Sequence, residues 1–365
     1  MHGKRAMRGW RVAVTSAAAS LLLAGCGSGY LLQAARGQVR LLGQREPISQ
    51  LIESPRTGEA LRRQLTEAQA AREFASASLG LPDNRSYRSF ADIGRPFVVW
   101  SVVATPEFST RPKEWCFPIV GCVAYRGYFS EASARAFAAT LAAQGHDVTV
   151  GGVPAYSTLG RFSDPLLSSM LRYGDTETAA TLFHELAHQV IYVKNDTAFN
   201  EAFATAVENA GLERWLALRG RSADLEARQR RQAFQRDIVR LLAASRADLV
   251  TLYRRREPPE SLPDATVREL KRDRLAQLAA DLRRIESAMG GRAGFSPWLE
   301  TGLNNAHLAS VATYWDCVPG FERLLAEADG SLTAFYASVR AEARRPAEER
   351  RARLCGALPS APPPT

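Results

Sequence analysis

Several patterns that would define a class of protein are missing from this 365-residue sequence. No Cys-x-x-Cys pair occurs, which argues against a zinc site built from thiolates. There is no internal repeat, and no apolar run reaches the roughly 20 residues that a membrane span needs. Histidine is scarce, with only five residues. The apolar fraction of 46% nevertheless indicates a globular chain, long enough for one large domain or two ordinary ones.

The first 25 residues have the layout of a secretory signal. Four basic residues precede an apolar stretch from Val12 to Leu23, and two small residues then lead to Cys26. The segment Leu23-Ala24-Gly25-Cys26 resembles a bacterial lipobox, in which the cysteine is lipidated and becomes the mature N-terminus. We therefore expect residues 1–25 to be a lipoprotein signal peptide. An uncleaved anchor helix is the alternative, which the shortness of the apolar run disfavours.

The residues after this segment bear on location and partners. Gly27 stands where an inner-membrane lipoprotein would often carry Asp, so we expect an outer-membrane lipoprotein that faces the periplasm and contacts the membrane through its lipid anchor. Cleavage before Cys26 would remove four basic residues and no acidic ones from the formal charge of +9. The remaining Arg residues are interspersed with Asp and Glu between Arg214 and Arg284. This pattern indicates solvated helix faces, and nucleic acid is not an expected partner.

Lipidation of Cys26 would leave an even number of cysteines. They are Cys116, Cys122, Cys317 and Cys355. An oxidising periplasm permits disulfides, and Cys116 with Cys122 would close a short loop. Four buried or free thiols are the alternative, and the pairing stays open at this stage.

Most of the chain has the apolar spacing of helices, with residues recurring three and four apart. The expected helical ranges are 30–42, 48–79, 130–144, 175–193, 197–218, 223–253, 266–289 and 297–327. The two long charged ranges, joined by a Pro-rich segment, predict a helical hairpin inserted at about 221–290. Residues rich in β-branched and aromatic side chains predict strands at 97–104 and 120–129.

Together these patterns predict an α+β fold that is mostly helical, with a small mixed β-sheet and the long hairpin. Residues 26–340 are expected to form a single domain. The segment 341–365 is rich in Arg, Ala and Pro and is expected to be a poorly ordered tail.

A further strand is expected from Asp147 to Thr158, interrupted by two glycines at 151 and 152. Pro154 marks it as a sheet edge, because proline cannot donate to a strand ladder. An unpaired edge can accept an extended peptide as an added strand, and the glycines would allow a close backbone approach. Ala155, Tyr156 and Ser157 are therefore predicted to bind substrate. An ordinary surface hairpin is the alternative.

The strongest chemical signal is the motif His184-Glu185-Leu186-Ala187-His188. Histidines four apart on a helix project from the same face, so their ring nitrogens can converge on one metal ion. Glu185 lies beside them and can reach a water in the open coordination position. The motif predicts a zinc site with His184 and His188 as ligands and Glu185 as general base.

A catalytic zinc takes three protein ligands and a water, so a third ligand is needed. Glu201 lies in the next expected helix, after a short turn, on a face it shares with Ala204, Thr205 and Glu208. Small residues on that face would let the two helices approach closely. Glu201 is thus the predicted third ligand, and His307 is the competitor.

These motifs carry a resemblance to known families. The run His-Glu-Leu-Ala-His-Gln followed by Asn-Glu-Ala-Phe-Ala resembles the gluzincin metallopeptidases, whose third ligand is the Glu of a similar second segment. With the lipobox and short segments near residues 127, 152–160, 164 and 304, the chain from about residue 26 to residue 321 resembles the bacterial putative aminopeptidase lipoproteins. The gap from His188 to Glu201 is shorter than in the well-studied gluzincin aminopeptidases.

The resemblance implies a zincin-like fold, a Zn2+ cofactor and a peptide substrate, with activity as an aminopeptidase. Related enzymes use a Tyr or His besides the metal to stabilise the oxyanion. Tyr314 is the first candidate for this role here, and Tyr156 is the second. Thr205 or Glu208 is expected to orient a ligand histidine.

Two questions stay open on the sequence alone. The chain is either an enzyme or a non-catalytic envelope scaffold with a structural zinc, and Glu185 favours the enzyme because a structural site has no use for that carboxylate. Exopeptidase and endopeptidase activities are both possible, since no acidic anchor for a substrate's free amine can be identified.

Overall fold

The computed structural model describes residues 29–117, 120–290 and 294–355. The predicted signal peptide and Cys26 lie outside the described residues. The chain forms two compact units, and the described part of the first, which ends at Arg45, contains one helix over residues 29–43. The second unit, from Glu46 onward, holds all the elements that follow.

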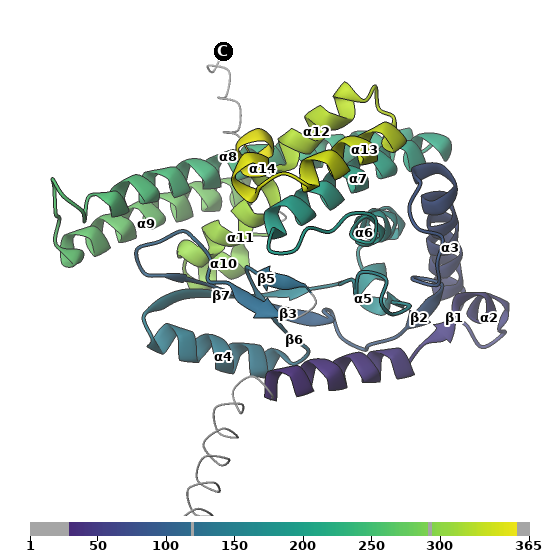
Figure 1. The fold of residues 1–365 in the computed structure, drawn as a ribbon. Helices are drawn as coiled ribbons and strands as arrows, with labels where there is room; N and C mark the ends of the chain where they lie inside the picture. The colour runs from purple at the N-terminus through teal and green to yellow at the C-terminus, as the bar shows by residue number, and fades with distance from the viewer. Residues whose placement is uncertain (1–28, 118–119, 291–293, 356–365) are drawn as a thin grey trace, which may run out of the picture. The chain divides into compact units, whose positions relative to one another are not determined.

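The second unit is mostly helical, which confirms the predicted α+β class (Figure 1). Its helices are α2 (Ile48–Glu53), α3 (Glu59–Leu79), α4 (Glu131–Ala143), α5 (Ser168–Leu171), α6 (Asp175–Ala187), α7 (Thr197–Leu218), α8 (Ser222–Arg254), α9 (Asp264–Ala288), α10 (Ser296–Thr301), α11 (Asn305–Trp315), α12 (Val318–Glu327), α13 (Leu332–Ala343) and α14 (Ala347–Leu354). Two expected helices are interrupted. The range 48–79 is broken around Pro55 and Gly58, and the range 297–327 is broken first at Gly302, whose φ of 86° no helix accommodates.

In the described residues the strands form three small sheets, whereas a single mixed sheet was expected. A mixed sheet contains β1 (Glu46–Pro47), β2 (Ser89–Ala91) and β8 (Leu166–Leu167). An antiparallel sheet has the order β6 (Arg126–Tyr128), β3 (Val99–Pro106), β7 (His146–Val153). A third pair, β4 (Trp115–Phe117) with β5 (Gly121–Val123), is bridged by the disulfide Cys116–Cys122.

The predicted substrate-binding strand needs correction. Strand β7 is an edge, as expected, but it ends at Val153, and no strand includes Ala155, Tyr156 or Ser157. The carbonyl of Pro154 accepts a hydrogen bond from Ser169 Oγ at 2.5 Å, which leads the chain away from the ladder. The carbonyl of Val148 accepts a hydrogen bond from the Asn304 side chain at 3.0 Å. The N-terminal cap residue of α11 therefore already occupies one backbone acceptor of β7.

Gly152 has a packing role that the sequence did not suggest. A Cβ atom placed on Gly152 would lie 2.1 Å from the ring of Phe97. Glycine is therefore required here by the packing of the half-buried ring of Phe97. No such contact restricts Gly151, around which a Cβ would meet nothing within 4 Å.

The long hairpin is present as α8 and α9, which lie side by side in Figure 1. Its apolar residues form a common core with the start of α10 and with α11, and the members of this core include Ile238, Leu242, Leu249, Leu252, Val267, Leu275, Leu278, Leu282, Phe295 and Leu308. Burial of this continuous apolar stripe explains how two highly charged helices fold back onto the rest of the unit. Within the described ranges, no helix combines the length and apolar character that crossing a membrane requires.

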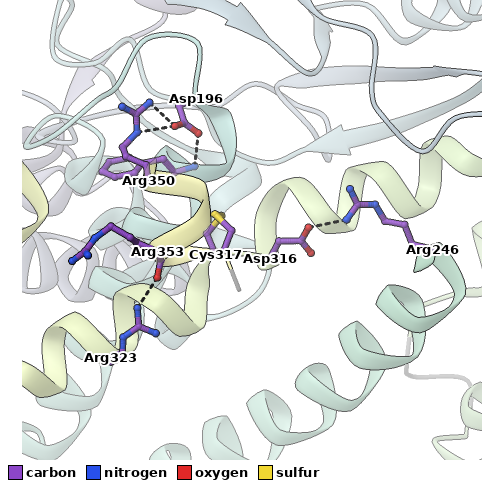
Figure 2. The surroundings of a disulfide bond; sticks show 9 residues. Asp196, Arg246, Asp316, Cys317, Arg323, Arg350 and Arg353 are labelled. Atoms are coloured by element: carbon purple, nitrogen blue, oxygen red, sulfur yellow. Dashed lines mark hydrogen bonds and ion pairs between the residues drawn. A yellow bond between two sulfur atoms is a disulfide. The ribbon is translucent and has the colours of Figure 1, made fainter. Parts of the chain in front are cut away.

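Residues 341–355 differ from the poorly ordered tail that their composition suggested. Helix α13 runs to Ala343, and α14 is tethered to the start of α12 by the disulfide Cys317–Cys355. Arg350 of α14 pairs with Asp196 (Figure 2); the two charged groups are 2.7 Å apart and largely buried. These long-range links, which local composition does not encode, order the segment.

Candidate metal centre

The two histidines of the motif lie at the carboxyl end of α6. Leu182, Phe183 and Leu186 are fully buried and fix this helix in the core. His184 is in the last turn and His188 is the residue at which the helix ends. Their ring centroids are 4.9 Å apart. The negative end of the helix dipole lies here, which favours a bound cation.

Glu201 is delivered to the same place by the turn between α6 and α7. Asp196 caps α7 by accepting from Phe199 N at 3.2 Å. The Asn200 side chain accepts from Val193 N at 2.7 Å and donates to Val193 O at 2.8 Å, so it clamps the turn. Asn200 is the first residue of the Asn-Glu-Ala-Phe-Ala segment, but the sequence did not reveal that its side chain holds this turn.

The three expected ligands converge. One carboxylate oxygen of Glu201 lies 3.3 Å from His184 Nε2 and 3.8 Å from His188 Nε2. One donor atom from each of the three residues lies within 4.8 Å of the others. Two imidazole nitrogens and one carboxylate are a donor set that zinc accepts, with a fourth position left for water. These residues thus fit a metal ion.

A second set of contacts orients His184. Its Nδ1 lies 3.1 Å from an oxygen of Glu208, and the other oxygen of Glu208 accepts from Arg228 at 2.6 Å. A carboxylate that accepts from Nδ1–H leaves the Nε2 lone pair directed at the metal. Of the two candidates for this role, Glu208 makes the contact. Arg228 belongs to α8, so the hairpin reaches the metal centre; sequence reasoning missed it among the many Arg residues of that helix.

His307 does not lie in the cluster. Its Nε2 is 3.1 Å from Thr149 Oγ1, and its Nδ1 is 3.2 Å from Asn304 N, where it completes the cap of α11. Among the described residues, one group of His, Cys, Asp or Glu side chains lies close enough together to hold a metal. It consists of His184, His188 and Glu201. Glu201, and not His307, therefore lies where a third ligand to a metal held by the two histidines would be.

Burial and charge set the protonation of the remaining groups. Burial raises the pKa of Glu185 to about 7, against the opposing effect of His184, and the side chain is 8% exposed overall. Burial lowers the pKa of His188 to about 4, so its ring is neutral. Against burial, the hydrogen bonds to Glu201 and Glu208 raise the pKa of His184 well above its usual value, so a metal ion bound here would displace a proton from His184.

Tyr314 comes from α11. Burial, followed by the charges of Glu201 and Glu185 among others, raises the pKa of its phenol well above the usual value. The phenol is therefore held in its protonated, hydrogen-bond-donating form within electrostatic reach of both carboxylates. Tyr156, the second candidate, interacts instead with Asp164, which together with burial raises its pKa.

Comparison with known proteins gives one further finding. A family model described as "Putative aminopeptidase" matches residues 29–354. No curated protein and no solved structure matches the chain.

Proposed function

We propose that this chain, which belongs to the "Putative aminopeptidase" family, is a zinc-dependent peptidase. The observation that carries the proposal is the convergence of His184, His188 and Glu201, with the buried carboxylate of Glu185 next to them. His184, His188 and Glu201 would hold a zinc ion, which would supply a Lewis acid for the scissile carbonyl and would lower the pKa of a bound water to about 7.

The chain's own residues supply the proton transfers and the remaining charge stabilisation. Glu185 takes a proton from the attacking water and passes it to the leaving amine, a role that its raised pKa suits. Tyr314 donates a hydrogen bond to the oxyanion of the tetrahedral intermediate. Glu208 holds the ring of His184 in the orientation that ligation needs.

The scaffold alternative is less well supported. A structural zinc site usually has four protein ligands. In the described part of the chain, three candidate ligands lie together. A carboxylate buried beside those three ligands, as Glu185 is, has a use in hydrolysis and none in a structural site.

The setting of the activity follows from the sequence alone and is part of the proposal. The lipobox at Leu23–Cys26 supports a lipid-anchored protein on the outer membrane, facing the periplasm, where peptides rather than nucleic acid are its partners.

The test compares Glu185→Gln with Glu213→Gln, an exposed position on α7. Glu185→Gln removes the base and leaves the three ligands intact, so hydrolysis of a peptide library should fall by about 10²- to 10⁴-fold at unchanged zinc content. Glu213→Gln should match the wild type in both. Equal turnover by Glu185→Gln and the wild type would exclude the proposed role of Glu185.

A further inference from the structure

Tyr87 has an unusual backbone for a large side chain. Its φ is 63°, in the left-handed region that favours glycine, yet the residue is only 2% exposed. Its N–H donates to Asp164 O at 2.6 Å. Such conformations persist where the surroundings impose them, and they gather at functional sites.

The surroundings of Tyr87 hold it rigidly beside the end of α6. The guanidinium of Arg72, itself 1% exposed, donates to Ser86 O at 2.9 Å and to Pro82 O at 2.8 Å. Gln189, the residue after His188, accepts from the Asn84 side chain at 2.7 Å. The loop that carries Tyr87 thus contacts both α3 and the residue that directly follows His188.

Two phenol groups in this region lack the partners that buried hydroxyls normally have. Among the described residues, neither Tyr87 nor Tyr156 makes a hydrogen bond through its buried hydroxyl oxygen. The hydroxyl of Ser157, whose oxygen accepts from Leu159 N, lies near the Tyr87 phenol and lowers its pKa, an effect smaller than the raising effects of burial, Glu185 and Asp164. Buried polar groups are almost always satisfied, so two unsatisfied hydroxyls point to a ligand that completes them.

Carboxylates act on both hydroxyls, and the guanidinium of Arg72, which is committed to backbone carbonyls of the loop, acts on Tyr87 with the opposite sign. Tyr87 interacts with Glu185 and with Asp164, and Tyr156 interacts with Asp164. Asp164 is 3% exposed, and its carboxylate accepts from Thr158 N at 2.9 Å and from Thr158 Oγ1 at 2.8 Å. Asp164 acts on both hydroxyls, so a ligand group between them meets a carboxylate in a poorly solvated place, which favours a cation.

We infer that the hydroxyls of Tyr87 and Tyr156, in the negative field of Asp164, bind the free α-ammonium group of a peptide substrate beside Glu185. Each phenol oxygen accepts an N–H of the ammonium group. The inference rests on the proposed function and deepens it, since it makes the protein an aminopeptidase rather than an endopeptidase. It also supplies the amine-binding group that the sequence alone did not identify.

The experiment uses pairs of peptide substrates that differ only in a free or an acetylated N-terminus. The full-length wild-type protein should cleave the free form with the higher kcat/KM. Tyr87→Phe and Tyr156→Phe should each raise KM for the free form by about 10-fold or more, the scale of a hydrogen bond to a charged group, and should change the acetylated form little. Tyr173→Phe, at an exposed position, should behave as wild type.

A second measurement separates binding from stability. Tyr87→Phe removes a buried hydroxyl that has no protein partner, so its thermal unfolding midpoint should equal or exceed that of the wild type. A lowered midpoint with equal loss on both substrates would mean that Tyr87 is merely structural, and would overturn the inference.

The inference and the proposed function fail in different ways. Equal cleavage of free and acetylated peptides by the wild type would refute amine binding and leave the peptidase intact. An absence of zinc-dependent cleavage of any peptide would refute the peptidase. In that case the amine site can still be tested by binding. If the wild type binds leucine amide but not N-acetyl-leucine amide, and Tyr87→Phe loses this binding, the amine site is supported. Equal binding of the two compounds would overturn it.

Discussion

Replacement of Arg228 by Met tests whether the hairpin supports the metal centre. The change removes the guanidinium that donates to Glu208 at 2.6 Å and keeps most of the side-chain stem. Glu208 then loses its cationic partner while its other oxygen still faces His184 Nδ1 at 3.1 Å. Arg228 also contacts Glu177 at 3.3 Å, so the change loosens the contact of α8 with α6 as well.

The expected magnitude follows from the position of Arg228. The side chains of Arg228 and Glu208 are only 16% and 19% exposed, so solvent screens this ion pair less than a surface pair. Loss of the direct partner of a ligand histidine typically costs 10- to 100-fold in metal affinity. Arg228 acts through that partner, Glu208, so we expect the lower end, about 10-fold or about 1.4 kcal/mol.

The assay is competition for zinc between the protein and a chromogenic chelator at fixed pH. Arg230→Met, two residues away with a side chain 71% exposed, is the matched control and should bind zinc as tightly as the wild type. If Arg228→Met binds zinc within twofold of that control, the chain of contacts from Arg228 through Glu208 to His184 does not support the metal.

Three further predictions concern other parts of the protein. Replacing both Cys317 and Cys355 by Ser opens a link across 38 residues, so the free energy of unfolding in urea should fall by up to about 4 kcal/mol; no change would show that the link contributes nothing. Tyr314→Phe should lower kcat by about 10²-fold with KM and zinc content little changed, and an unaltered kcat would remove Tyr314 from the mechanism. Cys26→Ser should abolish lipidation, measured by intact mass and membrane fractionation, whereas a wild-type N-terminus without acyl mass would contradict the lipoprotein proposal.

The part of the site that the sequence predicts is the part encoded locally. His184 and His188 are related by one helical turn, and Glu201 follows after a short capped turn, so periodicity alone places all three on facing helices. Glu208 is two further turns along the same helix as Glu201. The helix-rich fold class is predictable for the same reason.

What the sequence could not predict depends on contacts between distant segments. Arg228 is one of many Arg residues in α8, and only the packing of that helix selects it. Tyr87 lies about a hundred residues before the motif. Its left-handed backbone conformation could not be predicted, because the position is not a glycine. Gly152 suggested an open approach for a substrate, but it accommodates the ring of Phe97 from another segment.

The most direct test of the central claim is the zinc content of the purified full-length protein, measured by elemental analysis alongside peptide hydrolysis. We expect about one zinc per chain in the wild type. The double variant His184→Ala/His188→Ala should retain none and be inactive, because it removes two of the three converging donors. A double variant with the zinc content and activity of the wild type would contradict the account.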